Sequence, residues 1–481
     1  MSNDSMDRIL LRLMRIGLIL LILWKLLLMP DLPVVGELTV GINAVIGALV
    51  AVCGLRLWSR KLFSLPQKLL LAGFAWLMVV NLSGAPQTID DPLVQKTLQG
   101  GILAFLCCFP AGTLLEENSR GFIRQGVTVW CLPMALLAVA AVAAAYGGWF
   151  VQGSGSYVLG ISASTGRLEI FTYCTVAAQR LTLAMLLLMM SLTMTKQRGF
   201  RVAAIVCVAA MIPALCLTDG RNATLSLGIG AGLLLSVLLL DRCRLQGFRR
   251  IALAAGVTVC VAAVTFVGLH TLSGVMTLQV SRQPKELVLA DMALPQAQAE
   301  ETVPEEQPEA EAEETEEPEE PENQIMKLRS EDSVTSLSGR DAVWRALFAY
   351  YSDYPLALFT GTAQESAMHM VRKYVQGYDI YYVDMHNIYL QILLVTGLPG
   401  FVLAMAFVAL LVRAAWRVFF AAGIPLWRRM LPVPVIVLLI SELLECQTRI
   451  GRVDHLMMIF YLFAGMTFAA EAQLPRGKKV A

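Results

Sequence analysis

The sequence is poor in histidine and in charge. Only four of its 481 residues are histidines, and only 16% are charged. Its ten cysteines include no CxxC pair and no Cys/His spacing typical of metal ligands, so the sequence shows neither a zinc site nor a disulfide framework. The alternation of apolar and polar residues that marks a transmembrane β-barrel is also missing, and no internal repeat suggests the inverted halves of a transporter.

Hydrophobic residues, in contrast, make up 57% of the chain and give a mean hydropathy of +0.63. Soluble domains contain about 45–50% apolar residues. Here the apolar residues come in blocks of about 18–22 with few charges, the length needed to cross about 30 Å of hydrocarbon. These features exclude an ordinary soluble protein and predict an all-α fold, a polytopic bundle of transmembrane helices.

The hydropathy pattern predicts about twelve membrane spans, of which the third and eleventh are the shortest. The first apolar run carries Arg12, Arg15 and Lys25 and lacks a small-x-small cleavage site, so we expect a retained span rather than a cleavable signal. The predicted spans are approximately 9–29, 35–55, 69–82, 98–115, 127–149, 174–194, 202–218, 222–240, 251–272, 398–416, 431–445 and 455–470.

Loop charges predict the orientation of these spans. Basic residues gather in alternate connections, in the N-terminal segment and in the C-terminal tail, and the positive-inside rule places such segments in the cytoplasm. We therefore expect a multi-pass membrane protein with both termini in the cytoplasm. The expected organisation is spans one to nine in 1–272, a large extracytoplasmic loop in 273–397, and spans ten to twelve with a cytoplasmic tail in 398–481.

The large loop divides into two parts of opposite character. Thirteen glutamates lie between Glu300 and Glu322, and without them the net charge of the chain would change from +1 to +14. Residues 283–326 have too little apolar surface to fold, so we expect an extended acidic tether. In 327–397 we expect helices, and side chains at helical spacing predict an amphipathic helix on the outer face: Val343, Trp344, Leu347, Phe348, Tyr350 and Tyr351.

One histidine stands at the boundary between this loop and the tenth span. His386 opens the segment HNIYLQILLVTGLPG, which ends at Gly400, and histidine is the only common side chain that titrates near neutrality. A titratable group at a membrane boundary is costly to keep and therefore points to function. The alternative is a polar helix cap at the water interface.

Three arginines are predicted at one level near the outer interface. Arg167 precedes the sixth span, Arg221 lies in a tight turn between the seventh and eighth spans, and Arg340 begins the predicted surface helix. A guanidinium presents a fork of donors that matches phosphate oxygens, so these residues suit a lipid-linked phosphate or diphosphate. Alternatives remain open: Arg221 paired with Asp219, Arg340 paired with Asp341, and Arg167 snorkelling at a helix end.

With these residues in view, the chain resembles the O-antigen ligase and O-antigen polymerase superfamily of bacterial membrane glycosyltransferases. The resemblance covers roughly residues 70–470 and includes the number of spans and the large outer loop. Three motifs carry it, in this order: the Gly220-Arg221 turn; Ser338-Gly339-Arg340 with Trp344 and the later Phe359-Thr360-Gly361; and His386-Asn387-x-Tyr389-Leu390 with Gly397-Leu398-Pro399-Gly400.

The resemblance implies a function and a set of roles. Members of this superfamily transfer a glycan from an undecaprenyl-diphosphate carrier to an acceptor hydroxyl on the outer leaflet, without a metal or another cofactor. The acceptor is a glycan, a lipid or a wall polymer. By resemblance, His386 activates the acceptor hydroxyl, Arg221 and Arg340 hold the diphosphate, and Arg167 adds charge at the same site.

Two further residues are candidates for substrate binding. Arg180 lies deeper in the sixth span, where a charge is costly unless it is paired or lines a cavity. Tyr389 follows His386 by almost one helical turn and would line the same groove, with packing as its alternative role.

The sequence leaves three classes of function open. They are a ligase or polymerase, a flippase or permease for lipid-linked sugars, and a non-catalytic scaffold of an envelope assembly complex. Most spans are free of charge while the cations gather at one face, which favours surface chemistry over transport. No residue distinguishes a ligase from a polymerase, and we expect membrane and lipid-linked glycan partners rather than nucleic acid.

Overall fold

The structure is a computed structural model. It describes residues 3–27, 34–59, 64–83, 98–115, 119–152, 158–162, 165–243, 247–281, 340–362, 371, 374, 385–446, 448 and 455–474. The predicted acidic tether, 283–326, lies outside the described residues.

The first half of the bundle follows the apolar runs of the sequence. Because a membrane interior offers no water, each run satisfies its backbone N–H and C=O groups internally by forming a helix. These helices are α1 (Asn3–Leu27), α2 (Val34–Ser59), α3 (Leu65–Ser83), the π-helix η1 (Ile102–Cys108) continued by α5 (Phe109–Leu115), and α6 (Ser119–Gly147).

A small antiparallel sheet follows α6 and modifies the predicted all-α fold. Its strands are β1 (Val151–Gln152), β2 (Val158–Ile161) and β3 (Leu168–Ile170), paired in the order β1-β2-β3 with Leu159 opposite Ile170. Glycine and serine interrupt this connection while valine and isoleucine favour strands, so it forms a short sheet at the end of the bundle rather than a helix.

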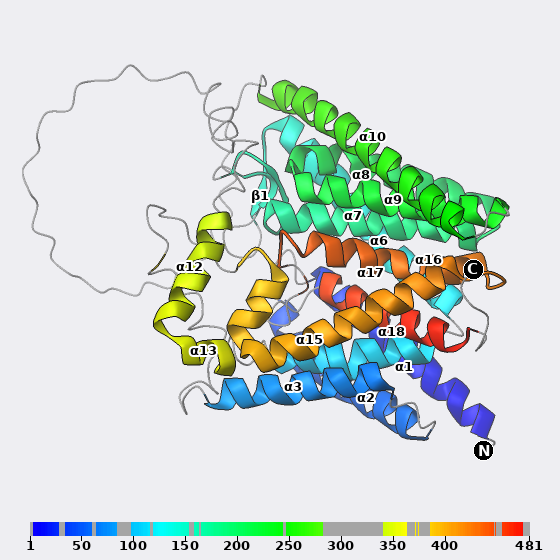
Figure 1. Ribbon diagram of the computed structural model, residues 1–481. Helices are drawn as coiled ribbons and strands as arrows, with labels where there is room; N and C mark the ends of the chain where they lie inside the picture. The colour runs from blue at the N-terminus through cyan, green and yellow to red at the C-terminus, as the bar shows by residue number, and fades with distance from the viewer. Residues whose placement is uncertain are drawn as a thin grey trace, which may run out of the picture.

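Four long helices come next: α7 (Cys174–Met194), α8 (Arg198–Thr218), α9 (Arg221–Arg242) and α10 (Phe248–Ser281). The C-terminal part contains α12 (Arg340–Asp353), α13 (Pro355–Thr360), α15 (Ile388–Phe420), α16 (Leu426–Met430), α17 (Pro432–Ser441) and α18 (His455–Ala472). Figure 1 shows α17 and α18 between the α6–α10 layer and the α1–α3 layer, with α15 running along α3.

Eight helices in the described residues are long and apolar enough to cross a membrane. The chain is therefore a polytopic α-helical membrane protein, but the number of about twelve spans stays a prediction. Helices α2 and α3 contain shorter apolar stretches, Ala44–Arg56 and Leu65–Asn81, and α17 has only 10 residues. Ten residues rise about 15 Å, half of the hydrocarbon thickness.

Two predicted boundaries fall inside helices. The outer loop was expected to begin at 273 and to end at 397, but α10 continues to Ser281 and α15 begins at Ile388. The predicted amphipathic helix in the loop is confirmed as α12, which buries Val343, Leu347 and Tyr350 while Phe348 stays exposed. The division of the chain into three segments remains a prediction.

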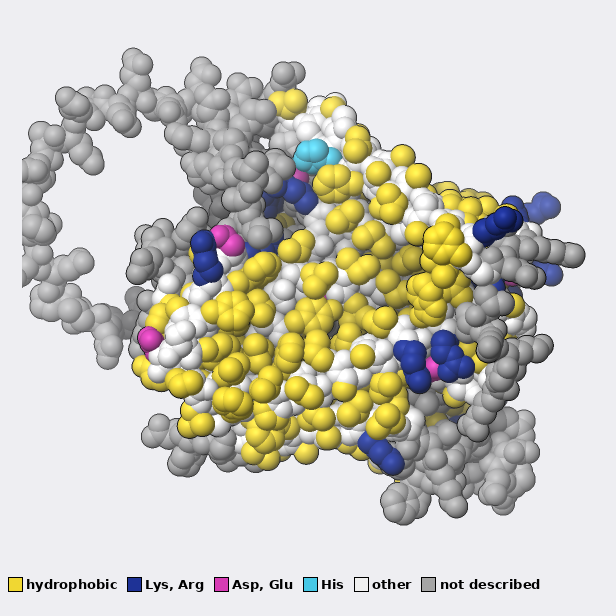
Figure 2. All heavy atoms as spheres, viewed as in Figure 1, with side chains coloured by type: hydrophobic (Ala, Val, Ile, Leu, Met, Phe, Trp, Pro, Cys, Tyr) yellow, Lys and Arg dark blue, Asp and Glu magenta, His cyan; other side chains and the backbone are white. Residues whose placement is uncertain are grey.

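The bundle has two ends of different character. The small sheet, α12, α13 and the first turns of α15 lie at one end, which we name the α12 end (Figure 1). The start of α1 and the end of α18 lie at the opposite end. Figure 2 shows a broad hydrophobic surface between the two ends and a group of Lys and Arg side chains at the end where α1 starts. This arrangement suits the predicted orientation, in which the α12 end faces outward.

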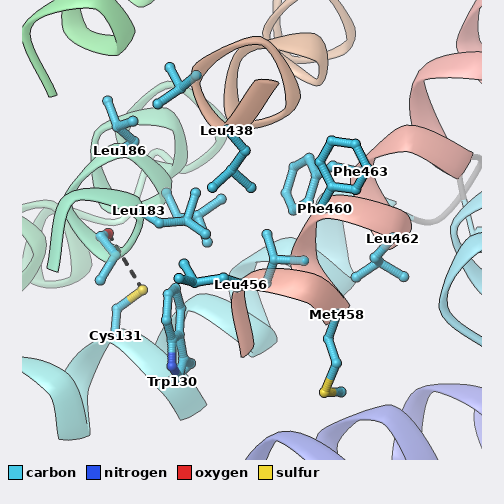
Figure 3. Close-up of a cluster of buried hydrophobic side chains, with 14 of the residues drawn as sticks. Trp130, Cys131, Leu183, Leu186, Leu438, Leu456, Met458, Phe460, Leu462 and Phe463 are labelled. Atoms are coloured by element: carbon cyan, nitrogen blue, oxygen red, sulfur yellow. Dashed lines mark hydrogen bonds between the residues drawn. The ribbon is translucent and has the colours of Figure 1, made fainter. Parts of the chain in front are cut away.

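Large apolar side chains fill the centre of the bundle between α6, α7, α17 and α18. Figure 3 shows Trp130, Leu183, Leu438, Leu456 and Phe460 in one buried cluster, beside the Cys131 thiol, which donates to the Ala184 carbonyl at 3.5 Å. Helix α18 also approaches α5 closely, because Gly112 and Gly465 lie at their contact: a Cβ at Gly112 would lie 2.0 Å from the Leu462 oxygen.

Candidate active site at the α12 end

Helix α15 begins at Ile388, two residues after His386. The Asn387 side chain caps it, because its Oδ1 accepts hydrogen bonds from the backbone N–H groups of Tyr389 (3.0 Å) and Leu390 (3.1 Å). The alternative interpretation of His386 as the helix cap is therefore wrong: its neighbour supplies the cap. The imidazole of His386 therefore takes no part in the cap of α15.

His386 has a strained backbone. Its φ is 47°, and the only other non-glycine residues of the described part with positive φ are Phe171 and Asp219. Such a conformation costs about 1–3 kcal/mol and persists only where the surroundings enforce it. Here the segment after α17 does so: the Glu442 carbonyl accepts from Ile388 N (3.0 Å), and the Leu443 carbonyl accepts from Asn387 Nδ2 (3.0 Å).

The same segment, Ser441–Cys446, brings two predicted catalytic residues together. Arg340 Nη2 donates to Glu445 Oε1 at 2.9 Å, and His386 Nδ1 lies 3.7 Å from Glu445 Oε2. The Glu445 side chain is only 5% exposed, compared with 21% for Arg340 and 26% for His386. Arg340 is thus paired with Glu445 and not with Asp341, which forms its own pair with Arg345 on the exposed side of α12.

Ser441, at the end of α17, connects this centre to α7 and α9. Its hydroxyl accepts a hydrogen bond from Gln179 Nε2, and its carbonyl accepts one from Asn222 Nδ2 at 3.1 Å. These two amides directly neighbour Arg180 and Arg221 in sequence. Both arginines are therefore carried by helices fixed to the segment that bears Glu445; Arg221 is half-buried, and Arg180 is buried inside α7.

Arg167 reaches the same region from the small sheet. Its Nη2 lies 3.9 Å from Asp219 Oδ2, and both side chains are 16% exposed. Asp219, the alternative partner proposed for Arg221, thus pairs with Arg167, while Arg221 N donates to the Asp219 carbonyl at 3.1 Å. The left-handed turn at Asp219, φ 50°, sets the first residue of α9 beside this pair.

Buried Glu169 lies in β3, which begins directly after Arg167. Its Oε2 accepts a hydrogen bond from Val158 N at 3.2 Å, across the sheet. Burial raises the pKa of Glu169 above its usual value, because the charged carboxylate loses water, and hydrogen bonds from Val158 and Ser162 act in the opposite direction.

Next to His386, a cavity of about 140 Å³ lies between α3, α15, α17 and α18. Tyr389 lines it and donates its hydroxyl to the Leu439 carbonyl at 3.0 Å, which agrees with a packing role, while its role in substrate binding stays a prediction. The lining is mainly apolar and continues along α15 as far as Val408. Its polar members Gln391 and Glu442 belong to the part nearest the start of α15.

Two of the sequence motifs form a single contact. Helix α15 is kinked at Gly397, where φ is 63°, and a Cβ there would lie 2.5 Å from Gly361 N. A Cβ at Gly361, φ 74°, would lie 2.6 Å from Gly397 N. Only glycine fits at both positions, and Thr362 N adds a hydrogen bond to the Leu394 carbonyl at 3.1 Å. This contact fixes α13, and with it α12, against α15.

The assembled groups have complementary chemistry. Guanidinium groups bind anions, an imidazole accepts or donates a proton, and a buried carboxylate orients both. In the part of the chain that the structure describes, no group of three or more His, Cys, Asp or Glu side chains could hold a metal ion. The arrangement is suited to binding an anionic substrate and moving a proton beside it.

Sequence reasoning missed Glu445, Ser441 and Asn222. One signal was present: Glu442 and Glu445 lie inside the predicted eleventh span, and acids in a span are costly unless they serve a purpose. The sequence does not reveal which cations these acids meet, because Arg340 and Glu445 are 105 positions apart in the chain.

Comparison with known proteins supports the predicted resemblance. No curated protein matches the chain. A family model described as O-antigen ligase matches residues 206–405, less than half of the chain. The matched segment contains Arg221, Arg340, His386 and the Gly361–Gly397 contact, whereas Arg167 and Glu445 lie outside it and join the site only in the fold. This match supports the resemblance to the O-antigen ligase and O-antigen polymerase superfamily that the motifs predicted.

Proposed function

We propose that the protein is a metal-independent membrane glycosyltransferase of the GT-C type. It transfers a glycan from an undecaprenyl-diphosphate carrier to an acceptor hydroxyl on the outer face of the cytoplasmic membrane, as a surface-polysaccharide ligase or polymerase. The observation that carries the proposal is the meeting of Arg340 and His386 on the Glu445 carboxylate at the α12 end. An anion-binding group and a proton acceptor stand side by side there.

The reaction breaks the bond between the anomeric carbon and the diphosphate oxygen and forms a bond from that carbon to the acceptor oxygen. The electron pair of the broken bond leaves with the diphosphate, and Arg340 and Arg221 stabilise its growing negative charge. The proton of the acceptor hydroxyl passes to His386. Fixed guanidinium groups in a site of low dielectric are worth more than in water, so they can serve where a metal would otherwise be needed.

Arg167 and Arg180 have supporting roles in this proposal. Arg167 contacts Asp219, two residues before Arg221, and adds positive charge to the diphosphate region. Arg180 is buried beside Gln179, which is hydrogen-bonded to Ser441, so we assign it to the deeper part of the donor site.

The apolar cavity beside Tyr389 supports a lipid-linked donor. A water-soluble sugar nucleotide would need no apolar lining, whereas an isoprenoid chain is stabilised by about 0.8 kcal/mol for each buried CH₂ group. The lining runs from Ile388 to Val408 along α15, and Gln391 and Glu442 make it more polar near the start of that helix. The diphosphate would then stand at the arginines while the chain extends along α15.

The test uses the full-length protein purified in detergent, with a lipid-diphosphate glycan donor and EDTA present. We expect wild-type protein to transfer the glycan and His386→Ala to lose about 10²–10⁴-fold in rate, because a positioned general base contributes that much. His270→Ala is the matched control: His270 lies exposed on α10, stacked on Phe266, and should leave the rate unchanged.

Other outcomes decide against the proposal. Equal rates for wild-type protein and His386→Ala would remove His386 from the reaction. Lipid-linked glycan that is bound by both but consumed by neither would indicate a carrier or a scaffold. Loss of wild-type transfer on addition of EDTA, restored by a divalent cation, would contradict metal independence.

A further inference from the structure

One carboxylate serves two partners at the α12 end. Glu445 Oε1 accepts from Arg340 Nη2 at 2.9 Å, and Glu445 Oε2 lies 3.7 Å from His386 Nδ1. The side chain is 5% exposed, and a carboxylate so far removed from water needs cationic or hydrogen-bonding partners. The neighbouring acid, Glu442, makes a different contact, because its Oε1 accepts from Thr448 N at 2.9 Å.

We propose that Glu445 is a positioning residue that couples the two halves of the site. Through His386 Nδ1 it holds the imidazole so that Nε2 is presented to the acceptor hydroxyl, and through Arg340 it neutralises the anion-binding group until a diphosphate arrives. This inference deepens the proposed function and rests on it.

The orienting role of Glu445 follows from the chemistry of imidazole. A neutral ring carries one N–H, and the group that accepts a hydrogen bond from one nitrogen leaves the other nitrogen as the proton acceptor. A carboxylate facing Nδ1 therefore favours an Nδ1–H and a basic Nε2. The separation of 3.7 Å is longer than a hydrogen bond, and such contacts often tighten only when substrate is bound.

The neutralising role of Glu445 follows from competition between anions. The guanidinium of Arg340 has several donors, and the one that contacts Glu445 is not available to a phosphate oxygen at the same time. A diphosphate must therefore compete with Glu445 for this donor. When Arg340 turns to the diphosphate, a His386 that has taken up the acceptor proton gives Glu445 a cationic partner in its place, so anion binding and proton transfer favour each other.

The proposal predicts opposite effects of one substitution on binding and on turnover. Glu445→Gln should lower kcat by about 10–100-fold, the size of effect seen when a group that orients a histidine is removed. The same substitution should tighten inhibition by inorganic pyrophosphate, or leave it unchanged, because Arg340 loses its competitor. If the ion pair were purely structural, Glu445→Gln would instead lower kcat and weaken pyrophosphate inhibition together, in parallel with a loss of stability.

The experiment measures kcat, donor KM and the inhibition constant of inorganic pyrophosphate for the full-length protein, with thermal unfolding of each variant. Glu471→Gln is the matched control: Glu471 is an equally paired carboxylate, 2.7 Å from Arg417, at the opposite end of the bundle. It should change none of the three constants. In the His386→Ala background, Glu445→Gln should lower kcat no further, because its effect on turnover acts through the histidine.

The results separate this inference from the proposed function. A wild-type protein that transfers no glycan contradicts the proposed function itself. Wild-type transfer with an unchanged kcat in Glu445→Gln, or with pyrophosphate inhibition that weakens as in Arg340→Lys, overturns the role of Glu445 alone. If Glu445→Gln does not fold, Glu445→Asp decides: the shorter side chain should lower kcat, and wild-type values of all constants would overturn the proposal.

Discussion

Arginine–carboxylate pairs occur at both ends of the bundle, but their surroundings differ. At the end where α1 starts, Arg413 and Arg417 share Glu471, and the two arginine side chains are 61% and 38% exposed. At the α12 end, Arg340 is 21% exposed and its partner Glu445 also faces an imidazole. Exposed pairs are worth about 0–1 kcal/mol and anchor helix ends in the interface. A shielded arginine retains a strong field and is available for a ligand.

The glycines show the same contrast. Gly54, in α2, has no atom within 4 Å of a Cβ built on it, so its identity serves no contact. Gly397 and Gly361, near the α12 end, each exclude any side chain because backbone atoms of the other lie about 2.5–2.6 Å from the built Cβ. A small side chain can therefore replace Gly54, whereas the contact between α13 and α15 requires glycine at both positions.

The largest effect that tests this comparison is expected from conservative changes of arginine. Arg340→Lys and Arg221→Lys keep the charge but replace a planar fork by a point donor, so we expect glycan transfer to fall by about 10–100-fold. Arg417→Lys, at the opposite end, should keep wild-type activity, and so should Arg345→Lys on the exposed side of α12. Transfer rates measured at saturating donor decide. Wild-type rates in both Arg340→Lys and Arg221→Lys would contradict the proposal that these two arginines hold the diphosphate.

A second, smaller effect concerns backbone conformation. Gly397→Ala forces a side chain into a left-handed backbone and against Gly361 N, so we expect destabilisation of at least about 1–3 kcal/mol. Gly54→Ala should be neutral or slightly stabilising, since alanine favours a helix where there is room. Thermal unfolding in detergent compares the two variants. An unchanged unfolding temperature in Gly397→Ala would mean that α15 can straighten without loss.

The smallest effect is expected from Glu169→Gln and depends on pH. The folded-state pKa of Glu169 is raised, so the folded protein binds the proton more tightly than the unfolded chain, and stability falls as pH rises through the folded pKa. Glutamine keeps the acceptor for Val158 N without the buried charge. The variant should therefore unfold at a higher temperature than wild type near pH 7, with the difference vanishing near pH 4. A difference that grows toward low pH would contradict this sign.

Much of the α12 end could be predicted from the sequence because its signals are local. Arg221 in the turn before a span, the amphipathic helix that begins at Arg340, and a histidine at the boundary between a polar loop and an apolar run all follow from periodicity and hydropathy. The small sheet is not predictable because a three-residue strand has almost no periodicity. The early start of α15 is not predictable from hydropathy because the Asn387 cap stabilises the first turn although polar residues surround it.

By itself the sequence determined that this chain enters a membrane as many apolar helices, and its motifs predicted a resemblance to the O-antigen ligase superfamily, which a family model supports over residues 206–405. These properties depend on composition and short motifs, which act over one helical turn or one span. The tertiary structure alone decided which acid each cation meets: Glu445 for Arg340 and His386, Asp219 for Arg167. Such pairs join distant parts of the chain, and only the packing of α7, α9, α15 and α17 around Ser441 brings them within contact distance.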